Sequence, residues 1–313
     1  MASEDTDLRP AKERPIPAKI SSTDESWPVE WLEVGGGSSL KLKKRVPPEQ
    51  KAVPLLSAET ADAAGASVSD LLPNKYEGGF KVWECARDLL EVMDEMVTRG
   101  ELQIENTAVL EAGCGAALPG VLALRLGARL AVLQDFNAAV LESVTMQTLQ
   151  LNGLWHRARA GGVRLLSGDW ASVDALLCDE RSRRAPADNS GDSDGGFDLV
   201  LSADTIYCTA ASTRLWQLVR SQLKRPNGVA LIAAKSYYFG VGGSTAAFKA
   251  LVDADGRFAC ESLRTFDDGA SNRREVFAVR WRSDASSMVQ APTTDEPAAK
   301  RAKGGGGFSF NFS

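Results

Sequence analysis

The segment Val109–Gly120 constrains the fold more than any other part of this chain. An apolar run ends at Glu111, and two glycines follow at Gly113 and Gly115. Glycine permits the tight turn and the close backbone approach that a bound ligand needs. A helix is expected to begin at Pro119, so the segment predicts a strand, a turn and a helix. In an open α/β sheet such a turn lies at the carboxyl end of the first strand, where cofactors bind.

Strand and helix patterns alternate from about residue 71 onwards. A helix is expected over 82–97, and Gly100 is a suitable residue to end it. Two strand-like runs, Arg257–Thr265 and Arg274–Trp281, come last and predict an antiparallel hairpin. Between the first helix and this hairpin we expect strands at 108–112, 130–134, 163–166, 198–202 and 229–234, and helices at 119–126, 138–151, 212–223 and 244–252.

This order predicts the α/β class, with a seven-stranded, doubly wound, Rossmann-like sheet that ends in a C-terminal antiparallel hairpin. Residues 1–70 are rich in Pro, Ser, Ala, Gly and charge, which predicts a mostly disordered N-terminal arm. An apolar island around Trp31 either docks on the domain or stays free. Residues 71–282 are expected to form the domain, with a flexible insertion at 179–196, and residues 283–313 a disordered tail.

Composition narrows the classes of function. The chain has 313 residues, 44% of them hydrophobic, and a net charge of −5, so charge favours neither nucleic acid nor a membrane as a direct partner. Its five cysteines show no C-x-x-C spacing and there is one histidine, so we expect no metal site. Scattered cysteines, no long apolar stretch and no secretory signal predict an intracellular protein. We expect a monomer.

The turn after the first expected strand selects the cofactor class. The dinucleotide pattern G-x-G-x-x-G fails, because Leu118 stands at its third glycine position. The acidic Glu111 favours a cofactor with a cationic end, and such a carboxylate can take up the amino group of S-adenosylmethionine. Asp135 closes the second expected strand, twenty residues past Gly115, where a carboxylate can accept hydrogen bonds from both ribose hydroxyls.

A third polar group follows the third expected strand. Gly168, Asp169 and Trp170 stand there, and the Asp can accept from an adenine amino group while the Trp ring packs on it. Each of these features alone also fits a structural role: a tight turn, a solvated strand end, a core tryptophan. Three of them in order at successive strand ends favour a seven-strand, S-adenosylmethionine-dependent (class I) methyltransferase.

The fourth expected strand ends near Asp204 and Tyr207, at the edge that faces the methyl group in such a fold. Asp204 is the candidate catalytic carboxylate that orients the nucleophile, and Tyr207 is the candidate wall of the methyl pocket. The alternative for Asp204 is a helix N-cap. The N/D-P-P-Y pattern used on exocyclic amines of bases is missing. A neutral imidazole already carries a lone pair, so one carboxylate suffices to align it.

Three motifs sharpen this hypothesis: Lys75–Cys85 (KYEGGFKVWEC), Gln134–Asn137 (QDFN) and Ala234–Ser244 (AKSYYFGVGGS). At these points the chain resembles the histidine protein methyltransferases, the methyltransferase-like 18 family. Members carry Y-E-G-G-x-K-x-W-E before the first strand, Q-D-[FY]-N after the second and K-x-x-Y-F-G-V-G-G after the fifth. The resemblance runs over roughly residues 68–281.

The resemblance implies a site residue by residue. The family's substrate is a histidine in a large-subunit ribosomal protein (uL3), so the resemblance implies that partner for this chain. The residues implied to contact the cofactor are Val82, Trp83, Glu84, Cys85, Ala86, Gly113, Asp135, Phe136, Asn137, Gly168, Asp169, Trp170 and Ser202. Those implied to shape the substrate entrance are Tyr238, Phe239, Gly240, Val241, Gly242 and Gly243.

Two departures from the family pattern stand out. The family commonly has Glu in S-E-T-I-Y, whereas this chain has the shorter Asp204, which shifts the reach of the carboxylate. The family usually opens with an F-x-F-x-F-like stretch, whereas in this sequence a similar stretch stands at Phe308–Phe312.

Two rival functions and one targeting signal stay open at this level. Asp204 and Tyr207 also match the D-x-x-Y of related protein-lysine methyltransferases. A cofactor-binding chaperone or assembly factor for a ribosomal protein is the rival from another class. Lys300, Arg301 and Lys303 predict either a nuclear-import signal, and hence cytoplasm and nucleus, or a solvated basic cluster.

Overall fold

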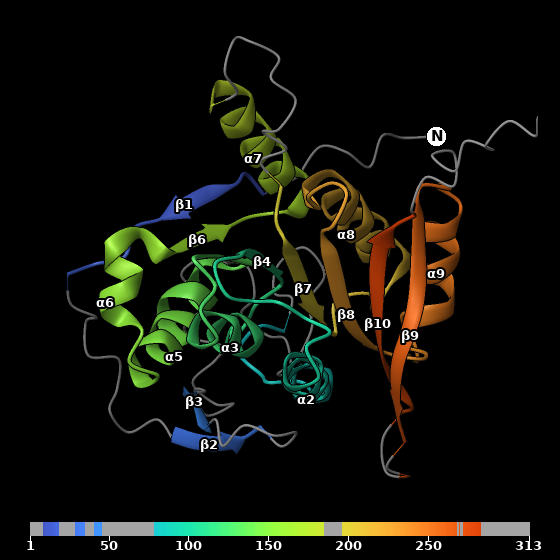
Figure 1. Ribbon diagram of the computed structural model, residues 1–313, viewed down its shortest axis with the longest axis horizontal. Coiled ribbons are helices and arrows are strands. Elements are labelled where there is room, and N and C mark those ends of the chain that lie inside the picture. Colours follow the sequence, from blue (N-terminus) through green and yellow to red (C-terminus); the bar gives the residue numbers. More distant parts are fainter. Residues whose placement is uncertain are drawn as a thin grey trace, which may run out of the picture. The chain divides into compact units, whose positions relative to one another are not determined.

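The computed structural model describes residues 9–18, 29–34, 41–45, 78–184, 196–267, 269 and 272–282, most of which build one central sheet with helices on both faces (Figure 1). The strands follow the order β1-β6-β5-β4-β7-β8-β10-β9 across this sheet. Their bounds are β1 Lys12–Arg14, β4 Ala108–Ala112, β5 Leu130–Asp135, β6 Val163–Ser167, β7 Leu199–Ala203, β8 Val229–Lys235, β9 Phe258–Phe266 and β10 Arg274–Trp281.

All seven predicted strands are present, in the order expected of a Rossmann-like methyltransferase sheet. Strands β4 to β8 pair in parallel, and β10 inserts antiparallel between β8 and β9, which confirms the C-terminal hairpin. Strand β4 has β5 on one side and β7 on the other, so the direction of winding reverses at β4. In open α/β sheets a ligand binds outside the carboxyl ends of the strands at such a point.

Helices cover both faces of the sheet (Figure 1). Because strand side chains alternate between faces, Val109 packs in the core beneath α2 and α3, while Leu110 packs in the core beneath α7, α8 and α9. The helices of the first face are α2 Glu84–Thr98, α3 Leu118–Arg125, α4 Ala138–Val140, the π-helical segment η1 Leu141–Thr145 and α5 Met146–Leu151; those of the second face are α7 Trp170–Arg184, α8 Thr209–Gln222 and α9 Thr245–Asp253.

Two regions differ from the sequence-based expectation. The N-terminal arm contains β1, which pairs antiparallel with β6 as an eighth strand of the sheet, and a separate hairpin of β2 (Val29–Glu33) and β3 (Lys41–Arg45). The expected insertion at 179–196 begins inside α7, which continues to Arg184, and 185–195 lie outside the described residues. A short helix, α6 (Trp155–Arg157), and a π-helical turn at Ala158–Gly162 precede β6.

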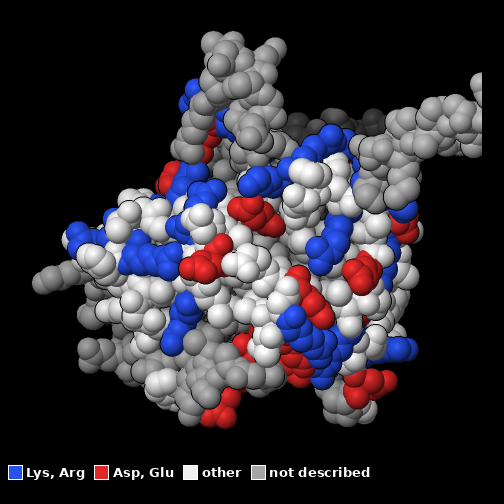
Figure 2. All heavy atoms as spheres, viewed as in Figure 1, with Lys and Arg blue, Asp and Glu red and all other residues white. Residues whose placement is uncertain are grey.

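The surface and the tail complete the description. Lys and Arg side chains are interspersed with Asp and Glu over the face seen in Figure 2. Among the described residues, no helix has both the length and the apolar composition to cross a membrane. The predicted tail at 283–313, with the basic cluster and the Phe motif, lies outside the described residues.

Candidate functional site

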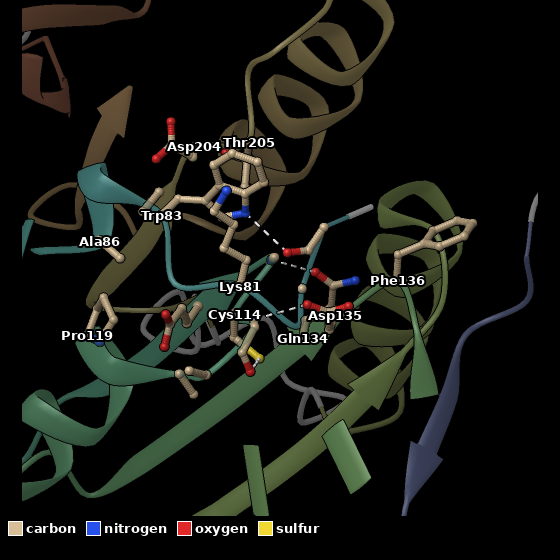
Figure 3. A pocket seen from close by; sticks show the side chains of 18 of the residues that line it. Lys81, Trp83, Ala86, Cys114, Pro119, Gln134, Asp135, Phe136, Asp204 and Thr205 are labelled. Atoms are coloured by element: carbon tan, nitrogen blue, oxygen red, sulfur yellow. Dashed lines mark hydrogen bonds between the residues drawn. The ribbon is translucent and has the colours of Figure 1, made fainter. Parts of the chain in front are cut away.

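A pocket lies at the carboxyl ends of the central parallel strands and encloses about 910 Å³, counting its open mouth (Figure 3). Its wall comes from the segment before α2, from the turns after β4, β5, β6 and β7, and from α8. The lining residues are Gly78, Gly79, Lys81, Val82, Trp83, Ala86, Glu111, Gly113–Pro119, Gln134–Phe136, Gly168–Trp170, Ala203–Thr205, Tyr207, Ala211 and Arg214.

The glycine turn after β4 forms the floor of this pocket. Gly113 and Gly115 have φ of +67° and +50°, a region that glycine enters without steric cost. A Cβ at Gly115 would lie 3.1 Å from the carbonyl oxygen of Gly79, so the segment before α2 approaches the turn closely. Thr145, in η1, donates a 2.6 Å hydrogen bond to the Gly115 carbonyl. The π-helical irregularity thus supports the turn directly, as such segments often do at functional sites.

Glu111 is a buried carboxyl group at the end of β4. Its Oε2 accepts a 2.8 Å hydrogen bond from the Gly120 amide at the start of α3. Burial raises the pKa of Glu111 to about 8, and the nearby Asp135 charge adds to the rise while the Gly120 bond opposes it. No basic side chain of the described residues pairs with Glu111, so a cationic ligand group placed beside it would favour its charged form and lower this pKa.

Two side chains at the end of β5 connect three strand ends. Asp135 accepts the amide of Gly115 at 3.0 Å on Oδ2 and the amide of Asn137 at 3.0 Å on Oδ1. Gln134 accepts from the Gly113 amide at 3.0 Å on Oε1 (Figure 3). These bonds fix the glycine turn against β5.

Gln134 also reaches the turn after β6. Its Nε2 donates to the Gly168 carbonyl at 2.8 Å, and its Oε1 accepts from the indole of Trp170 at 2.7 Å. The side chain is 1% exposed. Gln134 therefore joins the turns after β4, β5 and β6 into one hydrogen-bonded floor.

The far end of the pocket lies at the turn after β6. Asp169 accepts from the Ala171 amide at 2.8 Å through Oδ1, and its Oδ2 lies 3.6 Å from Nε of Arg214. The Asp169 amide donates to the Arg9 carbonyl at 3.0 Å, and the Arg9 guanidinium lies 4.5 Å from the centre of the Phe136 ring. The segment that leads into β1 therefore contacts this end of the pocket.

Asp204 follows β7 directly and lines the pocket near Trp83 (Figure 3). Its φ is +55°, a left-handed conformation that Asp tolerates better than most residues. Its carboxylate accepts from the Cys85 amide at 3.1 Å and from the Tyr238 hydroxyl at 2.8 Å. Burial raises the pKa of Asp204, and these two hydrogen bonds act against the rise. The Asp204 carboxyl group therefore lies at the edge of the sheet where we expect the nucleophile of the substrate to enter.

The structure brings most of the predicted site residues together and places others just behind the wall. Glu84, Cys85, Asn137 and Ser202 do not line the pocket; Glu84 instead pairs with Lys235 at 3.3 Å. Ser202 donates to the Ala112 carbonyl at 2.8 Å and so supports the glycine turn from β7. Tyr238–Gly243 follow β8 outside the pocket. The predicted residues that line it are Val82, Trp83, Ala86, Glu111, Gly113, Gly115, Asp135, Phe136, Gly168, Asp169, Trp170, Asp204 and Tyr207.

Several lining residues had no predicted role, among them Gln134, Lys81 and Arg214. Gln134 and Lys81 lie inside two of the motifs, which was the one available signal. Arg214 stands in the middle of α8 with no motif around it, and its buried Nε has no hydrogen-bond partner in the described part of the chain.

The polar groups that line the pocket are of the kinds that S-adenosylmethionine needs. Glu111 suits the amino group, the carboxylate of Asp135 suits the ribose hydroxyls, and Asp169 with Trp170 suits an adenine ring. The two glycines let Thr205 and the Gly79 backbone pack closely against the turn, since a Cβ at Gly113 would lie 2.7 Å from Thr205 and one at Gly115 would lie 3.1 Å from the Gly79 carbonyl oxygen. Fold and pocket together define an S-adenosylmethionine-dependent methyltransferase of the Rossmann-like class.

Comparison with known proteins identifies the family to which this chain belongs. The histidine protein methyltransferase 1 homolog of Dictyostelium discoideum is 34% identical to this chain, over 67% of this chain and 60% of that protein. The homolog of Rattus norvegicus is 31% identical, over 84% of this chain and 72% of that protein. Histidine protein methyltransferase 1 of Schizosaccharomyces pombe aligns at 33% over 58% of each chain. No protein-family model matches. A solved S-adenosylmethionine-dependent methyltransferase from Mesorhizobium loti aligns with 60% of this chain and 97% of its own, at 14% identity and a TM-score of 0.37.

The chain therefore belongs to the histidine protein methyltransferase family, as the three motifs predict. It spans between about three fifths and three quarters of the length of the first relatives named above.

Proposed function

We propose that this protein is a protein-histidine N-methyltransferase, which transfers a methyl group from S-adenosylmethionine to a histidine of the large-subunit ribosomal protein uL3. The observation that carries the proposal is the similarity to histidine protein methyltransferases over 84% of the chain, a stretch that is long enough to include most of the domain. The family resemblance supports uL3 as the substrate.

The pocket supports a division of roles among its residues. When bound, S-adenosylmethionine supplies an electrophilic methyl group on a sulfonium sulfur. Glu111 would hold its amino group, Asp135 its ribose, and Asp169 with Trp170 its adenine. Tyr207 would wall the space in which the methyl group is transferred.

Asp204 would orient the substrate. Its carboxylate lines the pocket, and it can accept the N–H of an incoming imidazole ring. The lone pair of the other ring nitrogen then points into the pocket, and a neutral imidazole needs no base before it attacks. A lysine ammonium would first have to lose a proton. Holding the nucleophile in line is the main contribution that such a site can make.

The loop after β8 supports a protein as the substrate. Phe239 is 76% exposed and Val241 44% exposed, on the loop Tyr238–Gly243, whose first residue bonds Asp204. Exposed apolar side chains next to a pocket mark a contact surface for a partner. We propose that this loop contacts the residues of the substrate that flank the target histidine.

The test is incubation of the full chain with methyl-labelled cofactor and uL3, with the modified residue identified by mass spectrometry. Label on a histidine is expected, with loss of label in Asp135→Ala and retention in Asp253→Ala, an exposed aspartate of α9. Label on a lysine would move the protein to the D-x-x-Y lysine methyltransferases. Cofactor binding without label on uL3 would contradict that substrate and favour the assembly-factor function.

The setting of the reaction is proposed from the sequence alone. We propose a monomer in cytoplasm and nucleus, with Lys300, Arg301 and Lys303 as the import signal and no direct contact with nucleic acid or membrane. Replacement of the three basic residues by alanine is expected to remove a fluorescently tagged chain from the nucleus. An unchanged distribution would contradict the signal.

A further inference from the structure

The Asp204 carboxylate is held from two directions. Cys85, in the first turn of α2, donates its amide to Oδ2 at 3.1 Å, and this amide is one of those that a helix leaves unpaired at its start. Tyr238 donates its hydroxyl to Oδ1 at 2.8 Å from the other side. A carboxylate has about four acceptor positions, so Asp204 keeps acceptor capacity toward the pocket that it lines.

The direction of the Tyr238 hydrogen bond is fixed by a third group. The amide of Lys235, at the end of β8, donates to the Tyr238 oxygen at 3.2 Å. An amide can only donate, so the phenol accepts from Lys235 and uses its single proton for Asp204. Burial, together with the Asp204 charge, raises the pKa of Tyr238, so the phenol stays protonated and cannot act as a base.

The other titratable groups near Asp204 do not replace this bond. Burial raises the pKa of the Cys85 thiol, which is therefore neutral. The Lys235 ammonium lies 3.3 Å from Oε2 of Glu84 and is held there as an ion pair. The Tyr238 hydroxyl donates to Asp204 at 2.8 Å, and the neutral Cys85 thiol, a weaker donor, also interacts with this carboxylate.

The loop turns Tyr238 inward while its two neighbours face out. Tyr237 and Phe239 are 46% and 76% exposed, and their rings meet edge to face at 5.1 Å. Gly242 and Gly243 close the loop onto Tyr238 through two backbone hydrogen bonds, from the Gly242 amide to the Tyr238 carbonyl at 3.0 Å and from the Tyr238 amide to the Gly243 carbonyl at 2.8 Å. This closure holds the phenol in place.

We propose that Tyr238 is a positioning residue, whose hydroxyl fixes the orientation of the Asp204 carboxylate and favours its charged form. The proposal rests on the proposed function, in which Asp204 aligns the substrate imidazole. It gives Tyr238 a role distinct from the contact with substrate that the family resemblance implies for the loop.

The test is Tyr238→Phe in the full chain, which removes the hydroxyl and keeps the ring. We expect kcat to fall about tenfold, because one hydrogen bond to a charged group is lost. The bond favours the carboxylate form of Asp204, so its loss raises the pKa of that group and moves the acidic limb of the kcat profile to higher pH. Tyr237→Phe, which removes the exposed neighbouring hydroxyl, is the matched control and should change neither quantity.

A double mutant shows whether Tyr238 acts through Asp204. In the Asp204→Asn background, Tyr238→Phe is expected to cause no further loss of kcat, whereas independent roles would multiply the two losses. Additive effects, or an unchanged kcat and acidic limb in Tyr238→Phe, would overturn the proposal.

One readout does not depend on the substrate. Carbon-13 NMR of aspartate-labelled protein, with the Asp204 signal assigned through Asp204→Asn, reports the titration of this carboxyl. Its midpoint is expected to rise in Tyr238→Phe and stay in place in Tyr237→Phe. A failure of uL3 methylation would leave this result standing, while an unmoved midpoint would overturn the inference about Tyr238 alone.

Discussion

At the scale of single residues, the protonation of Glu111 contributes to the pH dependence of stability. Its pKa of about 8 lies above the ordinary value of 4.5, so between these values the folded protein binds a proton that the unfolded chain has released. The free energy of unfolding should therefore fall as the pH rises through this window, by up to about 1.4 kcal/mol per pH unit. Below 4.5 both states are protonated and the effect vanishes.

Urea unfolding of the wild type and of Glu111→Gln at pH 5, 6, 7 and 8 measures this effect. Gln keeps an oxygen that can accept the Gly120 amide but has no proton to lose. The wild type should lose stability relative to Glu111→Gln with each step. Parallel curves for the two proteins would show that Glu111 titrates at its ordinary pKa.

Residue identity predicted the main groups of the pocket but not the contacts that assemble them. Glu111 and Asp135 were found because each is the polar residue that closes an apolar run. The role of Gln134 depends on three turns that meet only in the folded sheet. The bond between Tyr238 and Asp204 likewise joins residues 34 positions apart, and no local pattern indicates it.

At the scale of elements, the contact of β1 with β6 adds the N-terminal arm to the cofactor site. Glu13 of β1 forms a bidentate pair with Arg164 of β6, at 3.0 and 2.9 Å. This strand is preceded by Arg9, which contacts both Phe136 and Asp169. We expect β1 to support the adenine end of the pocket.

Glu13→Lys tests this role, because it places two cations side by side and should release β1. Loss of the Arg9 contacts is expected to weaken cofactor binding about two- to tenfold, as measured by calorimetry. Glu180→Gln is the control, since Glu180 also pairs with Arg164, at 2.8 Å, but belongs to α7 and not to β1. Equal affinities of Glu13→Lys and wild type would show that β1 does not support the site.

Elements were predictable where apolar residues recur with a clear period. Strands β4 and β10 have the predicted bounds, because each has a buried apolar centre. Strand β1 has the sequence Lys-Glu-Arg, and pairing at a sheet edge rather than burial makes it a strand. The sequence did not predict helix α7, because its residues are mostly Asp, Ser, Arg and other polar types. Its few buried apolar residues, such as Val173 and Leu177, do not form a clear helical period.

At the scale of the whole molecule, an ion pair between α2 and β10 connects the last strand to the helix that holds Asp204. Arg274 contacts Asp88 through Nε at 2.6 Å and through a terminal nitrogen at 3.3 Å, and both side chains are 8% exposed. Asp88 lies about one turn beyond Cys85 along α2. The late antiparallel strand and the catalytic edge of the sheet are therefore parts of one packed body.

Asp88→Ala leaves the Arg274 guanidinium buried without its carboxylate, so we expect the free energy of unfolding in urea to fall by about 3–5 kcal/mol. Asp253→Ala removes half of an exposed pair with Arg282, with side chains 56% and 51% exposed, and should cost less than about 1 kcal/mol because solvent screens that pair. Similar losses in the two variants would show that Arg274 finds other partners when Asp88 is gone. A large loss in Asp88→Ala alone would establish that this pair holds β10 to α2, the helix whose Cys85 amide donates to Asp204.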